Sequence, residues 1–481
     1  MGGPLDDSAT LSTPGQSPER TDDRLVSLDD SENPLCLSAF RKWVAVAVIC
    51  SASFCVTCAS SMASFTEIGM AAEFHVSREP TILMISLFVL GLGMGPLITG
   101  PFSEVYGRAI IYRVSYVLLV LLSFPVVFAP NLAVALVFRF LLGTAGASFL
   151  SVAGGSIADM FEGPKVSNPM AVYTISPFLG PVFGPLISGF INQNLYWRWT
   201  YRILLIWTFA ELLAIFLFVP ESYAPILLKR KACKLRRETG DTSYWAPLDR
   251  RDTSLTRSLM LSCSVPFKLL FFDRMALLLN TWNALLLGIL YLMFQAFPII
   301  FEKGHHLNEQ STGLTFSGIG LGMGFGLASQ PLWNSLSERE AAKHGGKAPP
   351  ETLLIMGQAG GILVPLSLYW FAFTTYPHVH WIVPIIASIP FGTGMFFAFT
   401  ATFTYLVTAY RPIAASAMAS NSFMRTAFAA VFPLFAGAMY NRLGTVGATA
   451  LLAGLSTLMA PLPFIFFKIG ARLRATSSFA V

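Results

Sequence analysis

Three ionisable residues lie well inside long apolar stretches of this 481-residue sequence: Arg139, Glu211 and Arg425. A charge at the centre of a membrane helix costs about 3 kcal/mol on insertion scales, so each of these residues is a candidate for function. Glu67 adds a carboxylate at the end of the first apolar stretch. A carboxylate in such surroundings can take up and release a proton, whereas arginine keeps its proton and acts by lowering the pKa of a nearby carboxylate.

The two glutamates are the candidates for carrying a proton, and each has a simpler alternative. Glu211 can instead serve as a hydrogen-bonding group between neighbouring helices. Glu67 can instead be a solvated carboxylate at a helix end. A third carboxylate, Asp159, lies just beyond the C-terminal end of its apolar stretch and fits better in an ion-paired loop. The sequence leaves the choice between Glu67 and Glu211 open.

Polar and aromatic residues in the later apolar stretches form a second candidate set. Asn421 and Arg425 are four residues apart and therefore share one face of a helix. We interpret the set as a cavity for amphipathic organic molecules, because a few polar groups among aromatic rings suit such ligands. The alternatives are packing or lipid contact for the aromatic residues and structural pairing for Asn421 and Arg425. The set comprises Asn280, Asn283, Tyr291, Gln295, Phe399, Phe403, Asn421 and Arg425.

Membrane-spanning helices are the elements that must position these residues. The chain is 54% hydrophobic and 12% charged, whereas soluble domains carry roughly a quarter of charged residues. Apolar windows of about 20 residues, the length that crosses a bilayer, predict an all-α integral membrane protein with twelve transmembrane helices. The windows lie at about 43–66, 80–99, 110–129, 132–154, 169–191, 200–219, 276–300, 313–333, 352–374, 381–408, 414–440 and 445–467.

The predicted helices divide into two halves of six. We expect an N-terminal six-helix bundle at 41–220 and a C-terminal six-helix bundle at 275–468, joined by a basic central loop at 221–274. Two equal apolar halves favour a pseudo-symmetric transporter. The acidic segment 1–40 is too polar to bury a core, so we expect it to be disordered. Residues 469–481 form a short C-terminal tail.

Lysine and arginine are concentrated on alternate connections between the predicted helices. The central loop carries the largest cluster, and the opposite side shows only a few cations, among them Arg78. By the positive-inside rule, both termini and the central loop face the cytosol.

The connection between the second and third predicted helices reads GPFSEVYGR. Its glycines allow a tight turn with positive φ and a close approach of two helix ends. Glu104 can cap the third helix or accept a hydrogen bond from Arg108. The plain alternative is a charged turn that only ends two helices. The residues of this loop that we single out are Gly100, Glu104, Gly107, Arg108 and Arg113.

This loop resembles the signature between helices 2 and 3 of the major facilitator superfamily, in its fungal form with glutamate in place of aspartate. The stretch LVFRFLLGTAGAS, which contains Arg139, resembles a second signature. The stretch SPFLGPVFGPLISGF looks like the motif that marks drug:proton antiporters. The matching residues of this antiporter motif are Gly180, Pro181, Gly184, Pro185 and Gly189.

The resemblance implies a twelve-helix drug:proton antiporter, and not an enzyme. It assigns Arg139 to proton coupling and the GPFSEVYGR loop to a cytoplasmic gate, and it sets helices 2 and 5 against helices 11 and 8. The expected substrate is an amphipathic organic compound such as a secondary metabolite, toxin or antifungal drug, exported by alternating access. We expect no cofactor beyond the proton gradient, no metal, no nucleic acid, a monomer, and a location in the plasma membrane, with the vacuolar membrane as the alternative.

Three features depart from the family pattern. The antiporter motif has Ser188 before Gly189 where two glycines are usual, Thr408 stands where relatives often have aspartate, and the loop between helices 8 and 9 lacks a GxxSExxGR pattern. An exporter of polyamines or of another endogenous small molecule is an alternative, although two interior arginines against one glutamate disfavour a cationic cargo. A non-transporting membrane sensor on the same scaffold is a more distant alternative.

Overall fold

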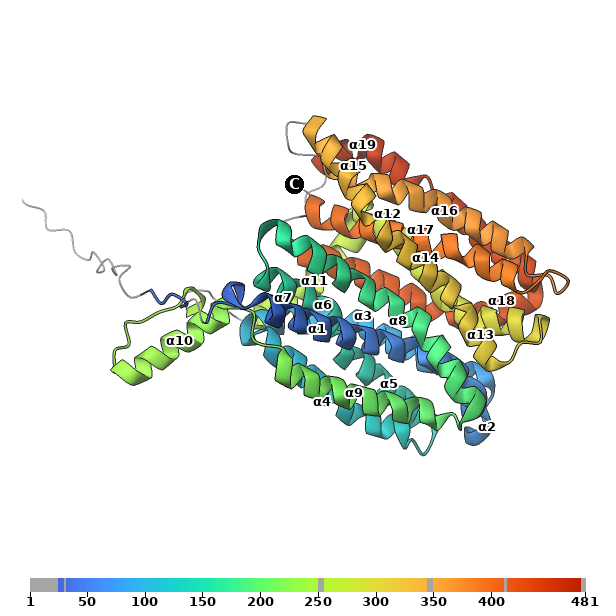
Figure 1. Ribbon diagram of the computed structural model, residues 1–481, viewed down its shortest axis with the longest axis horizontal. Coiled ribbons are helices and arrows are strands. Elements are labelled where there is room, and N and C mark those ends of the chain that lie inside the picture. The colour runs from blue at the N-terminus through green and yellow to red at the C-terminus, as the bar shows by residue number, and fades with distance from the viewer. Residues whose placement is uncertain (1–24, 30–31, 250–254, 344–348, 411–412, 477–481) are drawn as a thin grey trace, which may run out of the picture. The chain divides into compact units, whose positions relative to one another are not determined.

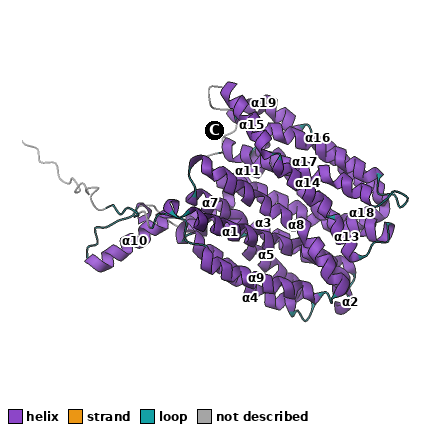
Figure 2. Ribbon diagram, viewed as in Figure 1, coloured by secondary structure: helices purple, strands orange, loops and turns teal. Residues whose placement is uncertain are grey.

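The computed structural model describes residues 25–29, 32–249, 255–343, 349–410 and 413–476. Within these ranges the regular structure is helical (Figure 2). The one β-bridge of the described residues joins Leu25 to Trp245. The chain separates into two compact units. The smaller unit comprises Met1–Asn33 and Ala224–Asp252, and the larger comprises Pro34–Tyr223 and Thr253–Val481.

The N-terminal half of the larger unit contains six membrane spans, of which the first and the fourth are built from more than one helix. Side chains cap two of these helices: Ser38 Oγ accepts from the N–H of Arg41 at 3.4 Å, and Asn131 Oδ1 accepts from the N–H of Val134 at 3.0 Å. The helices are α1 (Ala39–Ser61), α2 (Glu67–Phe74), α3 (Arg78–Tyr106), α4 (Arg108–Val127), α5 (Leu132–Gly146), α6 (Ser148–Ser151), α7 (Ala153–Met160), α8 (Ser167–Asn194) and α9 (Arg198–Phe218).

The long helices of the C-terminal half lie roughly parallel to those of the N-terminal half (Figure 1). The first helix of the C-terminal half precedes the membrane spans, and its first long span continues through a π-helical turn at Pro298–Gly304. The helices are α11 (Leu255–Phe272), α12 (Arg274–Phe297), α13 (Glu309–Thr315), α14 (Ser317–Ala328), α15 (Gln330–Lys343), α16 (Leu354–Phe373), α17 (Ile382–Ala409), α18 (Ala414–Met459) and α19 (Leu462–Thr476).

Ten helical segments of the described chain are long and apolar enough to cross a membrane, against the twelve predicted. The predicted helix at 313–333 is divided among α13, α14 and α15, each too short to be counted. The last two predicted helices lie in one segment, Ala414–Arg474, which bends at Gly444 (φ 71°). These two differences account for the lower number, and the all-α membrane fold is confirmed.

The two halves meet along two pairs of helices. α3 packs against α18, and α8 packs against α13 and α14. This confirms the expected pairing of the second helix with the eleventh and of the fifth with the eighth. Three glycines of α14 spaced by four residues do not take part in this contact, because Gly318, Gly322 and Gly326 all face α17 of their own half.

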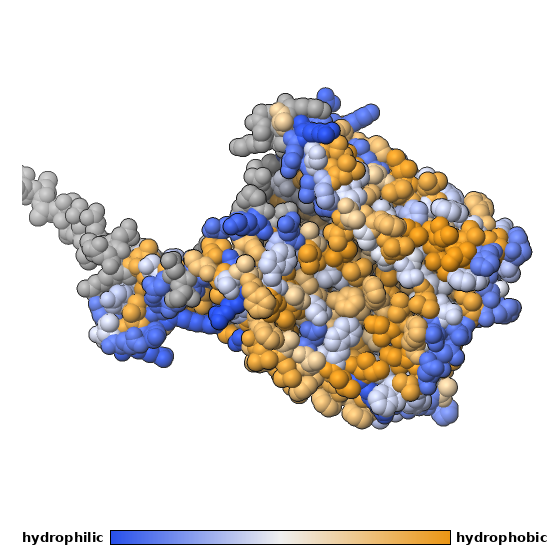
Figure 3. All heavy atoms as spheres, viewed as in Figure 1, coloured by the Kyte–Doolittle hydropathy of each residue, from blue (hydrophilic) through white to orange (hydrophobic). Residues whose placement is uncertain are grey.

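The flank of the larger unit is apolar. In the view of Figure 3, hydrophobic side chains cover most of this flank and hydrophilic ones gather toward the two ends of the helices. Large apolar side chains such as Leu217, which is 74% exposed, point outward from the helices. Such a surface fits contact with lipid, since a bilayer imposes no penalty on exposed apolar groups.

The smaller unit brings part of the acidic N-terminal segment against the central segment. Val26 packs with Ala232 and Ala246, and its N–H donates to the carbonyl oxygen of Trp245 at 3.2 Å. Lys231, on α10 (Ala224–Thr239), forms an ion pair of 2.5 Å with Asp29.

Part of the acidic segment is therefore ordered, and the central segment contains helices. Disorder through residue 40 does not hold for residues 25–29 and 32–40, because a small apolar contact and opposite charges order the first part and α1 begins at Ala39. Residues 1–24 lie outside the described residues. The central segment 221–274, expected as the loop that joins the two bundles, contains α10 and α11.

Close helix crossings make a first prediction. A Cβ at Gly143 of α5 would lie 2.8 Å from the carbonyl carbon of Phe88 in α3, so Gly143→Ala must push these helices apart. We expect it to destabilise the protein by about 1–3 kcal/mol. Gly437→Ala is the matched control, because a Cβ there meets nothing within 4 Å.

Thermal unfolding of the detergent-solubilised variants measures the difference. The control is expected to unfold at the wild-type temperature or slightly above it, since alanine is the better helix former by about 1 kcal/mol. Equal unfolding temperatures for the two variants would contradict the tight α3–α5 crossing.

Candidate functional site

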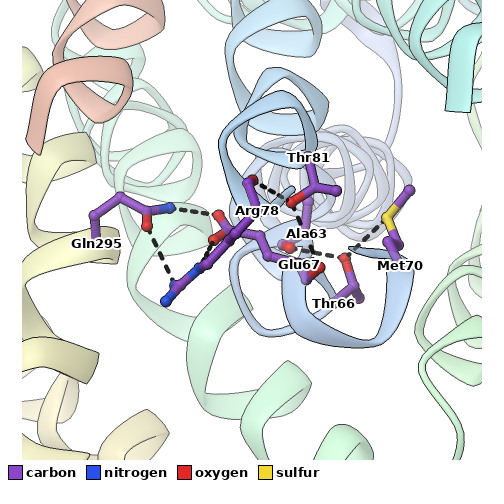
Figure 4. A network of polar contacts seen from close by, with 7 residues as sticks. All are labelled: Ala63, Thr66, Glu67, Met70, Arg78, Thr81 and Gln295. Atoms are coloured by element: carbon purple, nitrogen blue, oxygen red, sulfur yellow. Dashed lines mark hydrogen bonds and ion pairs between the residues drawn. The ribbon is translucent and has the colours of Figure 1, made fainter. Parts of the chain in front are cut away.

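A buried carboxylate links the two halves at one end of the larger unit. Glu67, the first residue of α2, is fully buried. One carboxylate oxygen accepts a hydrogen bond from Arg78 Nε at 2.9 Å, and the other accepts from Gln295 Nε2. Arg78 Nη2 also donates to Gln295 Oε1 at 3.3 Å, which closes a three-residue network (Figure 4). Glu67 and Arg78 belong to the N-terminal half and Gln295 to the C-terminal half.

Burial changes the acidity of this carboxylate. Glu67 lies two residues beyond the span Ala39–Phe65. Removal of the group from water raises its pKa to about 7, against the opposing effects of the Arg78 charge and of the hydrogen bonds from Arg78 and Gln295. The group therefore titrates near neutral pH in this conformation.

Further contacts join the halves near the same end, which we call the Glu67 end. Ser60 Oγ and Tyr291 Oη form a hydrogen bond of 2.7 Å between α1 and α12. The N–H of Glu309, in α13, donates to Gln193 Oε1 of α8 at 3.1 Å. With the Glu67 network, these bonds hold the two halves together at this end.

Arg139 of α5 lies behind this network, inside the N-terminal half. Its Nε donates to the carbonyl oxygen of Met84 at 3.0 Å, and its Nη2 donates to the carbonyl oxygen of Ala59. The guanidinium lies over the rings of Phe88 and Tyr201, at 4.3 and 5.5 Å from their centroids. No ion pair joins Arg139 to a carboxylate among the described residues.

One tyrosine connects the surroundings of Arg139 to those of Glu67. Tyr201 Oη is 3.1 Å from Thr66 Oγ1, and Thr66 precedes Glu67 in the chain. A cavity of about 20 Å³ is lined by Arg139 and Tyr201 among others, which is room for about one water molecule. Tyr201 thus links Arg139 to the residue before Glu67, although no hydrogen bond joins Arg139 to Glu67 in the described chain.

Glu211, the other candidate for the proton, is held within the N-terminal half. Its Oε1 accepts from Ser51 Oγ at 2.5 Å and from Trp207 Nε1 at 3.1 Å. The bond from Ser51 joins α9 to α1, which matches the alternative of a hydrogen bond between neighbouring helices, whereas Trp207 lies in α9 itself. None of them crosses to the C-terminal half.

The loop between α3 and α4 is pinned to its own half. Gly107 has a φ of 102°, so the positive φ expected of a loop glycine is found here. The N–H of Arg108 donates to Glu221 Oε1 at 2.8 Å, and its side chain pairs with Asp159 at 3.3 Å. The ion pair joins the loop to α7, as expected for Asp159.

Two details of this loop differ from expectation. Glu104 is exposed and forms no hydrogen bond or ion pair within the described part of the chain. Glu221 takes the expected capping role, because it follows α9 and lies directly against the turn. Gly100 has no positive φ, and a Cβ added there would meet open space, so no close approach requires this glycine. Arg113 donates to the carbonyl oxygen of Val219 at 3.3 Å, also in its own half.

The antiporter motif on α8 makes close contacts on two sides. A Cβ at Gly180 would lie 2.7 Å from the backbone nitrogen of Cys58, and one at Gly184 would lie 2.8 Å from the carbonyl oxygen of the same residue. Gly189 instead faces α13, where a Cβ would lie 2.6 Å from the carbonyl oxygen of Glu309. Pro181 and Pro185 lie within the helix between these contacts. The glycines of the motif therefore let α8 pack closely against α1 on one side and against α13 of the C-terminal half on the opposite side.

The predicted cavity residues do not form one cluster. Asn280 and Asn421 pair with each other at 2.9 Å between α12 and α18, which matches the structural alternative. Tyr291 and Gln295 belong to the contacts between the halves. Asn283 is fully buried, and neither polar atom of its side chain has a partner among the described residues.

The remaining predicted cavity residues, Phe399 and Phe403, lie around Arg425. Its guanidinium carbon lies 5.1 Å from the ring centroid of Phe403 and 5.5 Å from those of Phe399 and Phe178. The Phe178 and Phe399 rings are stacked at 4.7 Å. The arginine belongs to α18, two rings to α17 and the third to α8, so this group also spans both halves.

Sequence reasoning missed Phe178 and Arg78. Phe178 lies inside the antiporter-motif stretch but is not one of its glycines or prolines. Arg78 entered only as a cation for topology. A charged residue directly before an apolar helix and close to a glutamate was the available signal for an ion pair between Arg78 and Glu67.

Comparisons with known proteins agree with this architecture. Residues 49–430 match the family model of the Major Facilitator Superfamily. The chain is 43% identical to "Efflux pump atB" of Aspergillus terreus, covering 96% of this chain and 91% of that protein. It is 41% identical to "Probable drug/proton antiporter YHK8" of Saccharomyces cerevisiae, covering 92% and 87%.

A solved structure supports the same fold. The human organic anion transporter MFSD10 is 16% identical and superposes with a TM-score of 0.62, covering 88% of this chain and 99% of that one. With the family model across most of the chain and relatives above 40% identity, the chain belongs to the major facilitator superfamily.

Proposed function

We propose that this chain is a proton-coupled efflux transporter that exports an amphipathic organic compound by alternating access. The observation that carries the proposal is the similarity over more than nine-tenths of the chain to relatives named as an efflux pump and a drug/proton antiporter. Polar contacts between the two halves, such as the Glu67 network and the bond from Ser60 to Tyr291, support it, because such contacts can be broken and remade as the halves move.

Glu67 is the residue that we propose takes up the proton. Its pKa is about 7 when the halves are closed around it, and a solvent-exposed glutamate has a pKa near 4.3. A proton is therefore bound more tightly in the closed arrangement, so protonation favours closure. If the Glu67 end faces outward, as the positive-inside rule predicts, protons from outside close the outer side after substrate has left.

The inner side is closed in the opposite state. We propose that the loop around Arg108 acts there as a gate, supported by its ion pair with Asp159 and by its bond to Glu221. These bonds keep the loop rigid within its own half, so that it can meet the other half as one piece.

The setting of the transporter follows from the same reasoning. We propose a monomer in the plasma membrane with both termini in the cytosol, driven by the proton gradient without a cofactor. The vacuolar membrane remains the alternative location. Export of a polyamine is disfavoured, since the cations Arg139 and Arg425 lie in the interior of the two halves.

Accumulation of a dye and drug panel in a yeast strain lacking its own efflux pumps tests the proposed function. Cells that express the chain should accumulate less of at least one organic compound, and a protonophore should restore accumulation. Unchanged accumulation of organic compounds together with lower polyamine content would favour the alternative.

Replacement of Arg139 makes a second prediction. Arg139→Ala leaves two buried carbonyl oxygens and two helices without their shared donor, so we expect proton-driven efflux to fall to less than about a tenth of the wild-type rate. Membrane insertion should remain. Arg139→Lys is the control that keeps the charge but not the two-carbonyl bridge. Normal efflux by Arg139→Ala would exclude a coupling role.

Titration of Glu67 makes a third prediction. Because burial raises the pKa of this carboxyl to about 7, its contribution to stability is complete below about pH 4.3, its usual pKa, and is lost as the pH rises through about 7. The unfolding temperature of the wild type should therefore fall, relative to that of Glu67→Gln, between pH 5 and pH 8. Glu104→Gln is the matched control, since Glu104 is exposed. A constant difference between wild type and Glu67→Gln over this range would contradict the proposal.

A further inference from the structure

We propose that Arg425 is the anion-binding group of the substrate site, and that the exported compound carries an acidic group on a flat aromatic body. This inference rests on the proposed function and names the substrate class of that transporter. It is based on two observations: two N–H donors of Arg425 have no hydrogen-bond partner among the described residues, and three phenylalanine rings surround the guanidinium.

The guanidinium has unused donors. Nε and Nη1 of Arg425 are shielded from solvent and have no hydrogen-bond partner among the described residues. The side chain as a whole is partly buried. A buried charged donor without a partner is costly, and an arginine fork binds a carboxylate through two parallel bonds. A ligand carboxylate would supply the missing acceptors.

Comparison with Arg139 shows that unpaired donors are not a general feature of the buried arginines in this protein. Both arginines lie over aromatic rings, but Arg139 donates to two backbone carbonyl oxygens and Arg425 to no group in the described chain. Among the described residues, Arg425 contacts the rings of Phe178, Phe399 and Phe403, which attract the cation without accepting a conventional hydrogen bond.

The surrounding groups favour a flat apolar body next to the charge. Phe178, Phe399 and Phe403 stack on one another, with centroid separations of 4.7 to 6.1 Å. An aromatic ring of a ligand can replace one member of this stack at little cost. The ionisable groups that lie nearest to Arg425 are the neutral hydroxyls of Tyr173 and Tyr291, not carboxylates.

The position of the group fits a transport site. Phe178 comes from the N-terminal half, while Arg425 and the other two rings come from the C-terminal half. Movement of one half against the other therefore separates Phe178 from Arg425, which would open the site and release an anion held between them. An organic cation has no compensating charge here and would be repelled in this low-dielectric interior.

Binding of three matched probes to the purified full-length chain in detergent tests the proposal without requiring transport. The probes are naphthalene-2-carboxylate, the neutral naphthalene-2-carboxamide and the cation (naphthalen-2-yl)methylammonium, with affinity measured by microscale thermophoresis. Wild type should bind the carboxylate about tenfold or more tightly than the carboxamide, and the cation weakest. Arg425→Gln should lower the carboxylate affinity to that of the carboxamide and leave the carboxamide affinity unchanged.

Two controls protect this test from misfolding. Arg425→Lys should retain the preference for the acid, and Phe178→Leu should weaken the carboxylate and the carboxamide alike. Equal binding of the three probes by wild type, or an acid preference that survives in Arg425→Gln, would overturn the proposal. Acid binding that depends on Arg425 in a protein without proton-driven efflux would leave this site standing and refute the proposed function.

Discussion

The structure depends on one carboxylate that both halves share. Glu67 is buried, and it stays there because Arg78 of its own half and Gln295 of the other donate to its two oxygens. Burial raises its pKa to about 7. Contact between the halves and binding of a proton by Glu67 are therefore thermodynamically linked. The neighbouring contacts, from Ser60 to Tyr291 and from Gln193 to Glu309, are closed in the same arrangement.

The two interior arginines then divide the remaining tasks. Arg139 binds the backbone of the helices that lead to Glu67 and so fixes the surroundings of that carboxylate. Arg425 lies among rings from both halves with unused donors. One arginine has its hydrogen bonds satisfied by the protein, and the other is available to a ligand. This difference separates a coupling element from a binding element.

Much of the fold could be predicted from the sequence, because long apolar runs determine membrane helices locally. The positive φ of Gly107 and the pairing of Asp159 with the loop were also foreseeable, since glycine and opposite charges constrain short segments. The partners of distant residues were not. Glu221 lies more than 100 positions after Arg108, and Gln295 more than 200 after Glu67. Only the packing of the helices brings such pairs together.

Spin labels at the Glu67 end test the central account most directly. In Asn194→Cys/His378→Cys, made in a background without other accessible cysteines, the labels sit on exposed positions of opposite halves, and double electron–electron resonance reports their separation. The account predicts that the population with the short, closed distance grows as the pH falls from 8.5 to 5.5, with the growth setting in below about pH 7, and that Glu67→Gln stays closed at every pH. A distance distribution that ignores pH, or that still responds to it in Glu67→Gln, would contradict the account.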